Sequence, residues 1–392
     1  MPDDFGSDDI YLDHAATTPC DPRVIAAMTP YFGEKFGNPS SVYRLGQEAR
    51  AAVDTARLQV ARVLHCAPEE IIWAGGATEA DNFAIKGVMS AARRRVSRPH
   101  LITTGIEHHA VLHAAERLRE LAAQVTVLPV SETGIVSADE VAAAVRPETV
   151  LVSIMLANNE CGAIPPVADI AKAKTQRGIL VHTDAVQASG SLSLDVRELG
   201  VDLLVISAHK CYGPKGIGVL YARTGVELDP LLDGGGQESG RRGGTENVPG
   251  IVGCGLAVEQ ADLLRDRYLA HCTAVRNNLF DEIRRLIPDA QLNGPEFGKD
   301  RLPNNLSLWI PGLQGETLVL AMDIEGVAIS AGSACTTGRT EPSHVLLAMG
   351  LGDDRARSSV RLTVGRSTTP EAAREAAQRL ATCISRVRAL AN

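Results

Sequence analysis

Short apolar segments alternate with helical patterns through the first half of this chain. The apolar segments lie near residues 70–74, 101–106, 125–130, 150–157, 179–184, 203–207 and 218–222. Each has the length of a β-strand, and most are separated by a stretch long enough for a helix, which is the pattern of βαβ units. Because such units form sheets covered by helices on both faces, the alternation predicts an α/β fold with a large, mostly parallel, seven-stranded sheet.

The second half of the chain follows a different pattern. A glycine-rich stretch from Gly234 to Gly244 ends the alternation, and a helical pattern then runs from about Ile251 to Leu286. Beyond it the patterns predict strands near 305–310, 327–331 and 359–364, and helices near 315–325, 343–349 and 370–390. We expect a large domain over residues 21–255, a smaller α+β domain over 256–392, and an N-terminal tail and segment, 1–20, that packs with the small domain.

Composition excludes several classes of protein. The net charge of −8 argues against direct nucleic-acid binding, because phosphate backbones need a concentrated basic face. No run of 18 apolar residues occurs, and the first residues lack the pattern of a signal peptide, so we expect a cytoplasmic protein without membrane contact. The 8 cysteines form no C-x-x-C pair, which favours reduced thiols over disulfides or a metal site.

Two strand ends carry complementary charges. Lys210 follows the apolar run that ends at Ser207, and Asp184 ends the run that begins at Ile179, with Gln187 shortly after it. A lysine in such a place is costly to keep charged, and a neutral amine forms Schiff bases. A carboxylate opposite it suits pyridoxal phosphate, whose ring nitrogen needs an anionic partner. The alternative is that Lys210 is a surface lysine, and the flanking glycines and Asp184 argue against it.

Other strand ends supply groups for the same ligand. Gly75-Gly76-Ala77-Thr78-Glu79 follows a strand and opens a helix, where backbone N–H groups can hold a phosphate. His108 follows the strand that ends near 106, where it can stack on a ring, move protons or simply cap the next helix. Asn159 follows the strand near 150–157. Because ligands of open α/β sheets collect at the carboxyl ends of strands, these residues predict one site.

The chain resembles the cysteine desulfurases of the NifS/IscS type, which are fold-type I pyridoxal phosphate enzymes of the class-V aminotransferase family. The matching motifs run in order from Tyr11-Leu12-Asp13-His14-Ala15-Ala16-Thr17-Thr18-Pro19 to Val364-Gly365-Arg366. The resemblance implies that Lys210 binds the cofactor covalently, that Asp184 pairs with its ring nitrogen, and that His108 stacks on its ring. Gln187 and Asn159 would contact the ring or its phenolic oxygen.

The resemblance also implies a homodimer. The phosphate would be held by residues of one subunit together with Thr245 of the second, the first group being Ala77, Thr78, Ser207 and His209. Asn38 and Arg366 match positions that hold the substrate carboxylate. This chain carries Tyr43 where many relatives have histidine, and Cys161 where they often have a larger aliphatic residue.

Cys335 is the residue that discriminates among related activities. It lies in Ser330-Ala331-Gly332-Ser333-Ala334-Cys335, and in the family this cysteine, on a mobile loop, attacks the substrate sulfur. Small neighbours give access, and a thiolate is a strong nucleophile for sulfur. Without the resemblance, a buried structural thiol is the ordinary reading of such a cysteine.

The implied reaction converts L-cysteine into L-alanine and leaves a persulfide on Cys335. The sulfur would pass to an acceptor protein for iron–sulfur cluster assembly, thionucleoside formation in tRNA or DNA sulfur modification, and the acidic balance of the chain favours a protein acceptor. Aminotransferase, selenocysteine lyase and kynureninase-like activities are the alternatives within the fold. A non-catalytic scaffold is a further alternative, against which the lysine and aspartate speak.

Overall fold

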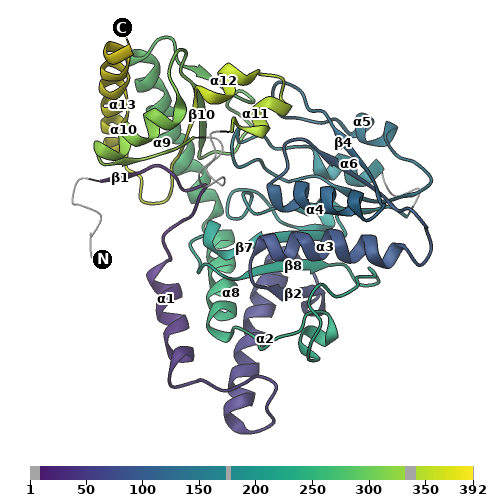
Figure 1. The fold of residues 1–392 in the computed structure, drawn as a ribbon. Coiled ribbons are helices and arrows are strands. Elements are labelled where there is room, and N and C mark those ends of the chain that lie inside the picture. The colour runs from purple at the N-terminus through teal and green to yellow at the C-terminus, as the bar shows by residue number, and fades with distance from the viewer. Residues whose placement is uncertain (1–8, 174–177, 332–340, 392) are drawn as a thin grey trace.

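A seven-stranded sheet forms the centre of the molecule (Figure 1). The structure is a computed structural model that describes residues 9–173, 178–331 and 341–391. The strands of the sheet are β2 (Ile71–Ala74), β3 (His100–Thr104), β4 (Gln124–Leu128), β5 (Thr149–Ser153), β6 (Leu180–Asp184), β7 (Leu203–Ser207) and β8 (Gly218–Ala222). Their order is β2-β8-β7-β6-β5-β3-β4, and only β8 runs antiparallel to its neighbours. The prediction of a mostly parallel seven-stranded α/β sheet is confirmed.

The two faces of this sheet pack on different helices. Along β2, Ile71 and Trp73 join one apolar cluster and Ile72 and Ala74 join another, as the alternation of side chains in a strand requires. The first cluster contains residues of α2 (Arg44–Leu64), α5 (Ala138–Ala143), α6 (Val167–Ala173) and α8 (Val248–Leu263). The second contains residues of α3 (Ala77–Ala92) and α4 (His109–Glu120). The sheet is therefore covered on both faces.

A separate apolar cluster lies beneath a second, antiparallel sheet. That sheet has the order β12-β13-β10-β9, with bounds Ser330–Ala331, Ser359–Thr363, Asn305–Trp309 and Gln291–Leu292. Its cluster contains residues of α9 (Arg265–Leu286), α10 (Gly315–Ile324) and α13 (Pro370–Ala391). The N-terminal strand β1 (Ile10–Tyr11) pairs in parallel with β11 (Val327–Ala328) and contributes Ile10 and Leu12 to the same cluster. The beginning of the chain thus packs with its last third.

The remaining elements are short helices and turns. They are α1 (Pro22–Met28), α7 (Val196–Leu199), α11 (His344–Ala348), α12 (Asp353–Arg357) and the 3-10 turns η1 (Thr29–Phe32), η2 (Pro68–Glu70), η3 (Ala208–Lys210) and η4 (Gln237–Gly240). In the described ranges, no helix combines the length and the apolar character that crossing a bilayer requires.

Two expectations about elements are wrong. The pattern from Ile251 to Leu286 is two helices, α8 and α9, which meet at Leu264. α8 packs in the cluster of the large sheet and α9 in the cluster of the second sheet, so the helical pattern continues although the helix does not. The strand expected near 327–331 is β11 and β12, which belong to different sheets.

Candidate active site

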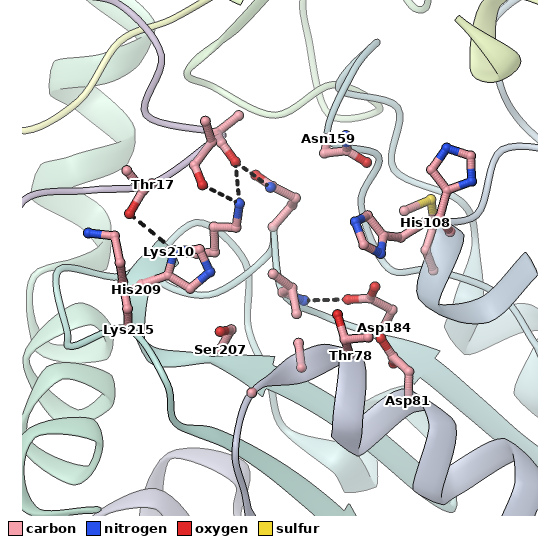
Figure 2. A pocket seen from close by; sticks show the side chains of 18 of the residues that line it. Thr17, Thr78, Asp81, His108, Asn159, Asp184, Ser207, His209, Lys210 and Lys215 are labelled. Atoms are coloured by element: carbon pink, nitrogen blue, oxygen red, sulfur yellow. Dashed lines mark hydrogen bonds between the residues drawn. The ribbon is translucent and has the colours of Figure 1, made fainter. Parts of the chain in front are cut away.

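A cavity of about 720 Å³ opens at the carboxyl ends of the parallel strands. Nine of the residues that sequence reasoning placed in one site line it, namely Ala77, Thr78, His108, Asn159, Asp184, Gln187, Ser207, His209 and Lys210. They come from the ends of β5, β6 and β7 and from the starts of α3 and α4, as Figure 2 shows for those that it labels. The convergence that the strand-end pattern predicted is thus present in the structure.

Lys210 lies at the end of the turn η3, directly after β7. Its Nζ donates hydrogen bonds to the carbonyl oxygens of Ala15 (2.6 Å) and Ala16 (2.7 Å), which belong to the N-terminal segment. The Gln187 amide donates to the same Ala15 carbonyl at 3.0 Å. Sequence reasoning missed these two carbonyls because backbone acceptors leave no residue-type signal. They hold the lysine amine over the cavity (Figure 2).

Asp184 ends β6 at the floor of the cavity and is only 6% exposed. Burial raises the pKa of its carboxyl, while the backbone N–H of Val186, which donates to Oδ1 at 2.9 Å, and the nearby Lys210 favour the ionised form. A buried carboxylate without a full set of partners is costly, so it favours a cationic partner in the cavity. This is the group that a ring nitrogen of pyridoxal phosphate requires.

The start of α3 forms another part of the cavity wall, with Ala77 and Thr78 among the lining residues. The first N–H groups of a helix have no partner within the helix, and they attract anions. Gly218 of β8 lies so close that a Cβ there would be 2.6 Å from the carbonyl carbon of Gly76 and 2.9 Å from the nitrogen of Ala77. Ser207 is the register partner of Gly218 on β7. The helix start is therefore pressed against the sheet edge and presents its N–H groups to the cavity.

His209 also lines the cavity. Its Nδ1 is 3.1 Å from Thr17 Oγ1, and its backbone carbonyl accepts a hydrogen bond from the N–H of Thr18. Burial, with help from Lys210 and Lys215, lowers the pKa of His209 to about 4. The imidazole is thus neutral near pH 7. The positive charge beside it comes from Lys215, which also lines the cavity.

His108 caps the following helix, which was one of the alternatives that the sequence left open, and it also lines the cavity. It is the N-cap of α4, with Nδ1 accepting the backbone N–H of Ala110 at 3.1 Å. Burial lowers the pKa of His108 to about 4, so the ring is neutral. Because Nδ1 is an acceptor, the ring proton lies on Nε2. His108 therefore offers the cavity a hydrogen-bond donor.

Arg361 is a cavity residue that sequence reasoning missed. It lies in β13 and is 3% exposed, and its guanidinium donates to the Asn159 carbonyl (3.0 Å) and to Asp13 Oδ1 (2.7 Å). These contacts join three segments that are distant in the sequence. Its position between Val360 and Leu362 in a predicted strand is the signal that could have found it, since buried charges are rare without a partner.

Other predicted residues lie elsewhere in the chain. Asn38 and Thr245 are exposed and are not among the residues that line the cavity. Arg366 is also outside the lining, where it lies 4.0 Å from the Tyr212 ring centre and 3.6 Å from Asp21 Oδ2. Their predicted roles with substrate and phosphate stay predictions. Cys335 lies outside the described residues.

The two departures from the usual motifs have different settings. Tyr43 is 59% exposed at the start of α2. Cys161 is fully buried in a small apolar cluster with Ile106 and Met155, and burial raises its pKa to about 11. A thiol in that state is a poor nucleophile, so Cys161 is a packing residue.

Comparisons with known proteins match this chain to one family. Residues 10–374 match the class-V aminotransferase family. The cysteine desulfurase IscS of Dictyoglomus turgidum is 46% identical over 93% of this chain and 91% of its own length. A solved NifS-like protein superposes with a TM-score of 0.90 at 37% identity, covering 96% of this chain and 99% of its own. A solved structure of SspA in complex with cysteine has a TM-score of 0.79 at 36% identity, with coverage of 91% and 99%.

The chain therefore belongs to the class-V aminotransferase family, whose members use pyridoxal phosphate. Within that family it groups with the cysteine desulfurases of the NifS/IscS type. The residues present fit the cofactor on three counts: a strand-end lysine amine, a buried carboxylate, and a helix start that a Cβ at Gly218 would obstruct.

Proposed function

We propose that this chain carries the cysteine desulfurase activity of its family in the cavity between Lys210 and Asp184, with Cys335 as the sulfur acceptor. The observation that carries the proposal is the convergence of the Lys210 amine, the buried Asp184 carboxyl and the start of α3 in one cavity. An amine, an anion and an anion-binding helix end are the three groups that pyridoxal phosphate needs from a protein. When bound, the cofactor supplies an electron sink for the carbanion character that develops at the substrate Cα.

Lys210 first holds the cofactor through Nζ and then acts as a base. With the substrate in the cavity, the Lys210 amine would be the base that takes the Cα proton. The carbonyls of Ala15 and Ala16 give the amine a defined resting position at one side of the cavity. Asp184 would supply the negative charge that the ring nitrogen needs, and Gln187, whose amide donates to the Ala15 carbonyl, would help to hold the ring.

His108 acts as a donor in this proposal. The neutral imidazole carries its proton on Nε2, so it can donate a hydrogen bond to the substrate. The imidazole can also stack on the flat ring of the cofactor. Nε2 can accept a proton only after it has given up its own. Asn159 lies beside it in the cavity, where the Arg361 contact to its carbonyl orients the residue for a polar contact with substrate or ring. Arg366 and Asn38 are proposed to hold the substrate carboxylate, as the family motifs imply.

Cys335 completes the reaction. Its thiolate attacks the substrate sulfur, so an S–S bond forms while the C–S bond breaks. The electron pair of that bond and a proton remain on the carbon fragment, which leaves as L-alanine. The products are alanine and a Cys335 persulfide. No external oxidant or reductant is needed, because the two-electron oxidation of sulfur to the persulfide level is balanced by the reduction of the substrate carbon, whose C–S bond becomes a C–H bond.

The surroundings of the reaction are part of the proposal. We assign the active form as a homodimer in which Thr245, exposed on its own chain, contributes to the phosphate site of the second copy. The proposed domain division at residues 20 and 255 is supported by the two separate apolar clusters, although Val258 and Ala261 of α8 still pack in the cluster of the large sheet. We assign the protein to the cytoplasm. We also propose that the persulfide passes to an acceptor protein of the iron–sulfur assembly pathway, which the IscS names suggest.

The test is incubation of the purified holoenzyme with L-cysteine, with alanine and sulfide measured separately. The proposal expects alanine and, with a thiol present, sulfide in equal amounts. Alanine formation that requires a keto acid instead would indicate an aminotransferase. Absence of alanine would leave the scaffold alternative. A competition between L-cysteine and selenocysteine, with selenide, sulfide and alanine measured, tests for a selenocysteine lyase. Such an enzyme would prefer selenocysteine as its substrate.

A further inference from the structure

Three buried side chains from two elements meet under the floor of the cavity. His182 and Asp184 are two residues apart on β6, so both point to the same face of the sheet. That face packs on α3, which brings Asp81 over them, and Asp81 lies beside Asp184 in Figure 2. The exposed fractions of His182, Asp184 and Asp81 are 0%, 6% and 1%. Asp81 also lines the cavity, one helical turn after the start of α3.

Asp81 differs from Asp184 in its partners. In the ranges that the structure describes, neither carboxyl oxygen of Asp81 accepts a hydrogen bond. Asp184 accepts a hydrogen bond from the N–H of Val186, and the positive charge of Lys210 stabilises its ionised form. A fully buried carboxylate with no donor is far more costly than one with a donor and a cation nearby. Of the two carboxyls, Asp184 therefore ionises first.

The groups that face Asp81 do not offer it a positive charge. His182 Nε2 is 3.4 Å from Asp81 Oδ1, but burial lowers the pKa of His182 to about 3, so this imidazole is neutral. Its Nδ1 is 2.8 Å from Ser153 Oγ on β5. From the turn before α4, Glu107 adds a second buried carboxyl, and its pKa is raised to about 8. Burial, Asp184 and Glu107 all raise the pKa of Asp81 well above its usual range.

We propose that Asp81 is a positioning residue that stays protonated and donates its O–H to Asp184, so that a single negative charge at the cavity floor is held on Asp184. His182 and Ser153 continue this network away from the cavity. The same helix whose start lines the cavity thereby sets the charge and orientation of the Asp184 carboxylate. The inference rests on the proposed function only for the identity of that ligand.

Infrared difference spectroscopy of the holoenzyme without substrate tests the protonation of Asp81. The spectrum of the wild type minus that of Asp81→Asn at neutral pH is expected to contain the C=O stretch of a carboxylic acid. Asp139→Asn, which changes an exposed aspartate at the start of α5, is the matched control and should show loss of carboxylate bands only. A carboxylate band in place of the acid band for Asp81→Asn would overturn the proposal.

A titration of Asp184 tests the donor role. The acid band of Asp184, identified by its loss in Asp184→Asn, is followed against pH in three backgrounds. Asp81→Asn keeps a donor and should leave the Asp184 midpoint unchanged, whereas Asp81→Ala removes the donor and should raise the midpoint by on the order of one pH unit. If Asp81 were ionised, both variants would lower the midpoint, because each would remove a negative charge. Where Asp81→Ala does not fold, the Asp81→Asn midpoint decides alone.

Turnover separates this inference from the proposed function. Alanine formation by the wild type tests the proposed function, and the infrared bands do not depend on it. If the wild type makes alanine but its Asp81 is ionised, the proposed function stands and the inference about Asp81 is wrong.

Discussion

Gly218→Ala is a small change that tests the phosphate end of the cavity. Gly218 begins β8 between the ends of β2 and β7, where its register partners are Ala74 and Ser207. The added Cβ would lie 2.6 Å from the carbonyl carbon of Gly76 and 2.9 Å from the nitrogen of Ala77. Both are backbone atoms at the start of α3, so no flexible side chain can move aside. The helix start has to move by about 0.8 Å to reach ordinary contact distance.

A shift of this size misdirects the N–H groups that the proposal assigns to the phosphate. Each hydrogen bond to a charged group contributes about 1.5–3 kcal/mol, so the loss of one weakens cofactor binding by about 10- to 150-fold. The strained packing also costs about 1–3 kcal/mol of folding stability. Gly33→Ala is the matched control, because a Cβ at Gly33 has no atom within 4 Å and the residue has a φ of −138°.

The assay is a titration of the cofactor-free proteins with pyridoxal phosphate, followed by visible absorbance, together with urea unfolding curves of the same samples. We expect weaker binding by Gly218→Ala at a protein concentration and temperature where the curves show it to be folded, and no change in Gly33→Ala. A folded Gly218→Ala that binds the cofactor within twofold of the wild type would refute the assignment of the α3 start as the phosphate site.

Three further changes test other parts of the site. Lys210→Ala should lose the visible absorbance of the covalently held cofactor and should form no alanine; turnover by this variant would remove the lysine from its assigned role. Asp184→Ala should still bind pyridoxal phosphate but lose orders of magnitude in rate, because the ring nitrogen loses its anionic partner; an unchanged rate would contradict this. Glu160→Gln tests a buried carboxyl whose pKa is raised by burial from 4.5 to about 7. Because the folded pKa lies above the unfolded one, wild-type stability falls as pH rises between these two values, by at most about 3 kcal/mol relative to the variant. Urea unfolding of both proteins at pH values on either side of this window measures the difference, and parallel stability curves would show that Glu160 does not titrate there.

Local patterns were sufficient for the sheet and for much of the cavity lining. Lys210, Asp184 and Asn159 each lie at or after the end of an apolar run with a strand's length. The rule that parallel strands end at one edge of a sheet predicts that they lie together, as they do in the cavity. The start of α3 was predicted in the same way, because small residues after a strand indicate a tight turn into a helix. These predictions depended only on interactions within a few residues of each group.

Contacts between distant segments could not be predicted in this way. The carbonyls of Ala15 and Ala16 meet Lys210 across nearly two hundred positions, and a carbonyl exists at every residue. Arg361 reaches Asn159 and Asp13 only because β13 packs near the cavity. The break between α8 and α9 has the same origin, since each helix packs on its own cluster while the apolar pattern continues. His108 caps α4 and also lines the cavity, so the capping role does not exclude a place in the site.

The most direct test of the account is mass spectrometry of the wild type and of Cys335→Ser after treatment with L-cysteine, with alanine measured in the same samples. The account predicts one added sulfur atom at Cys335 in the wild type and a matching amount of alanine. It predicts a Cys335→Ser protein that keeps the cofactor absorbance but neither turns over nor gains sulfur, because a hydroxyl is essentially un-ionised at neutral pH and a poor nucleophile toward sulfur. Added sulfur at Cys161, or undiminished alanine formation by Cys335→Ser, would contradict it.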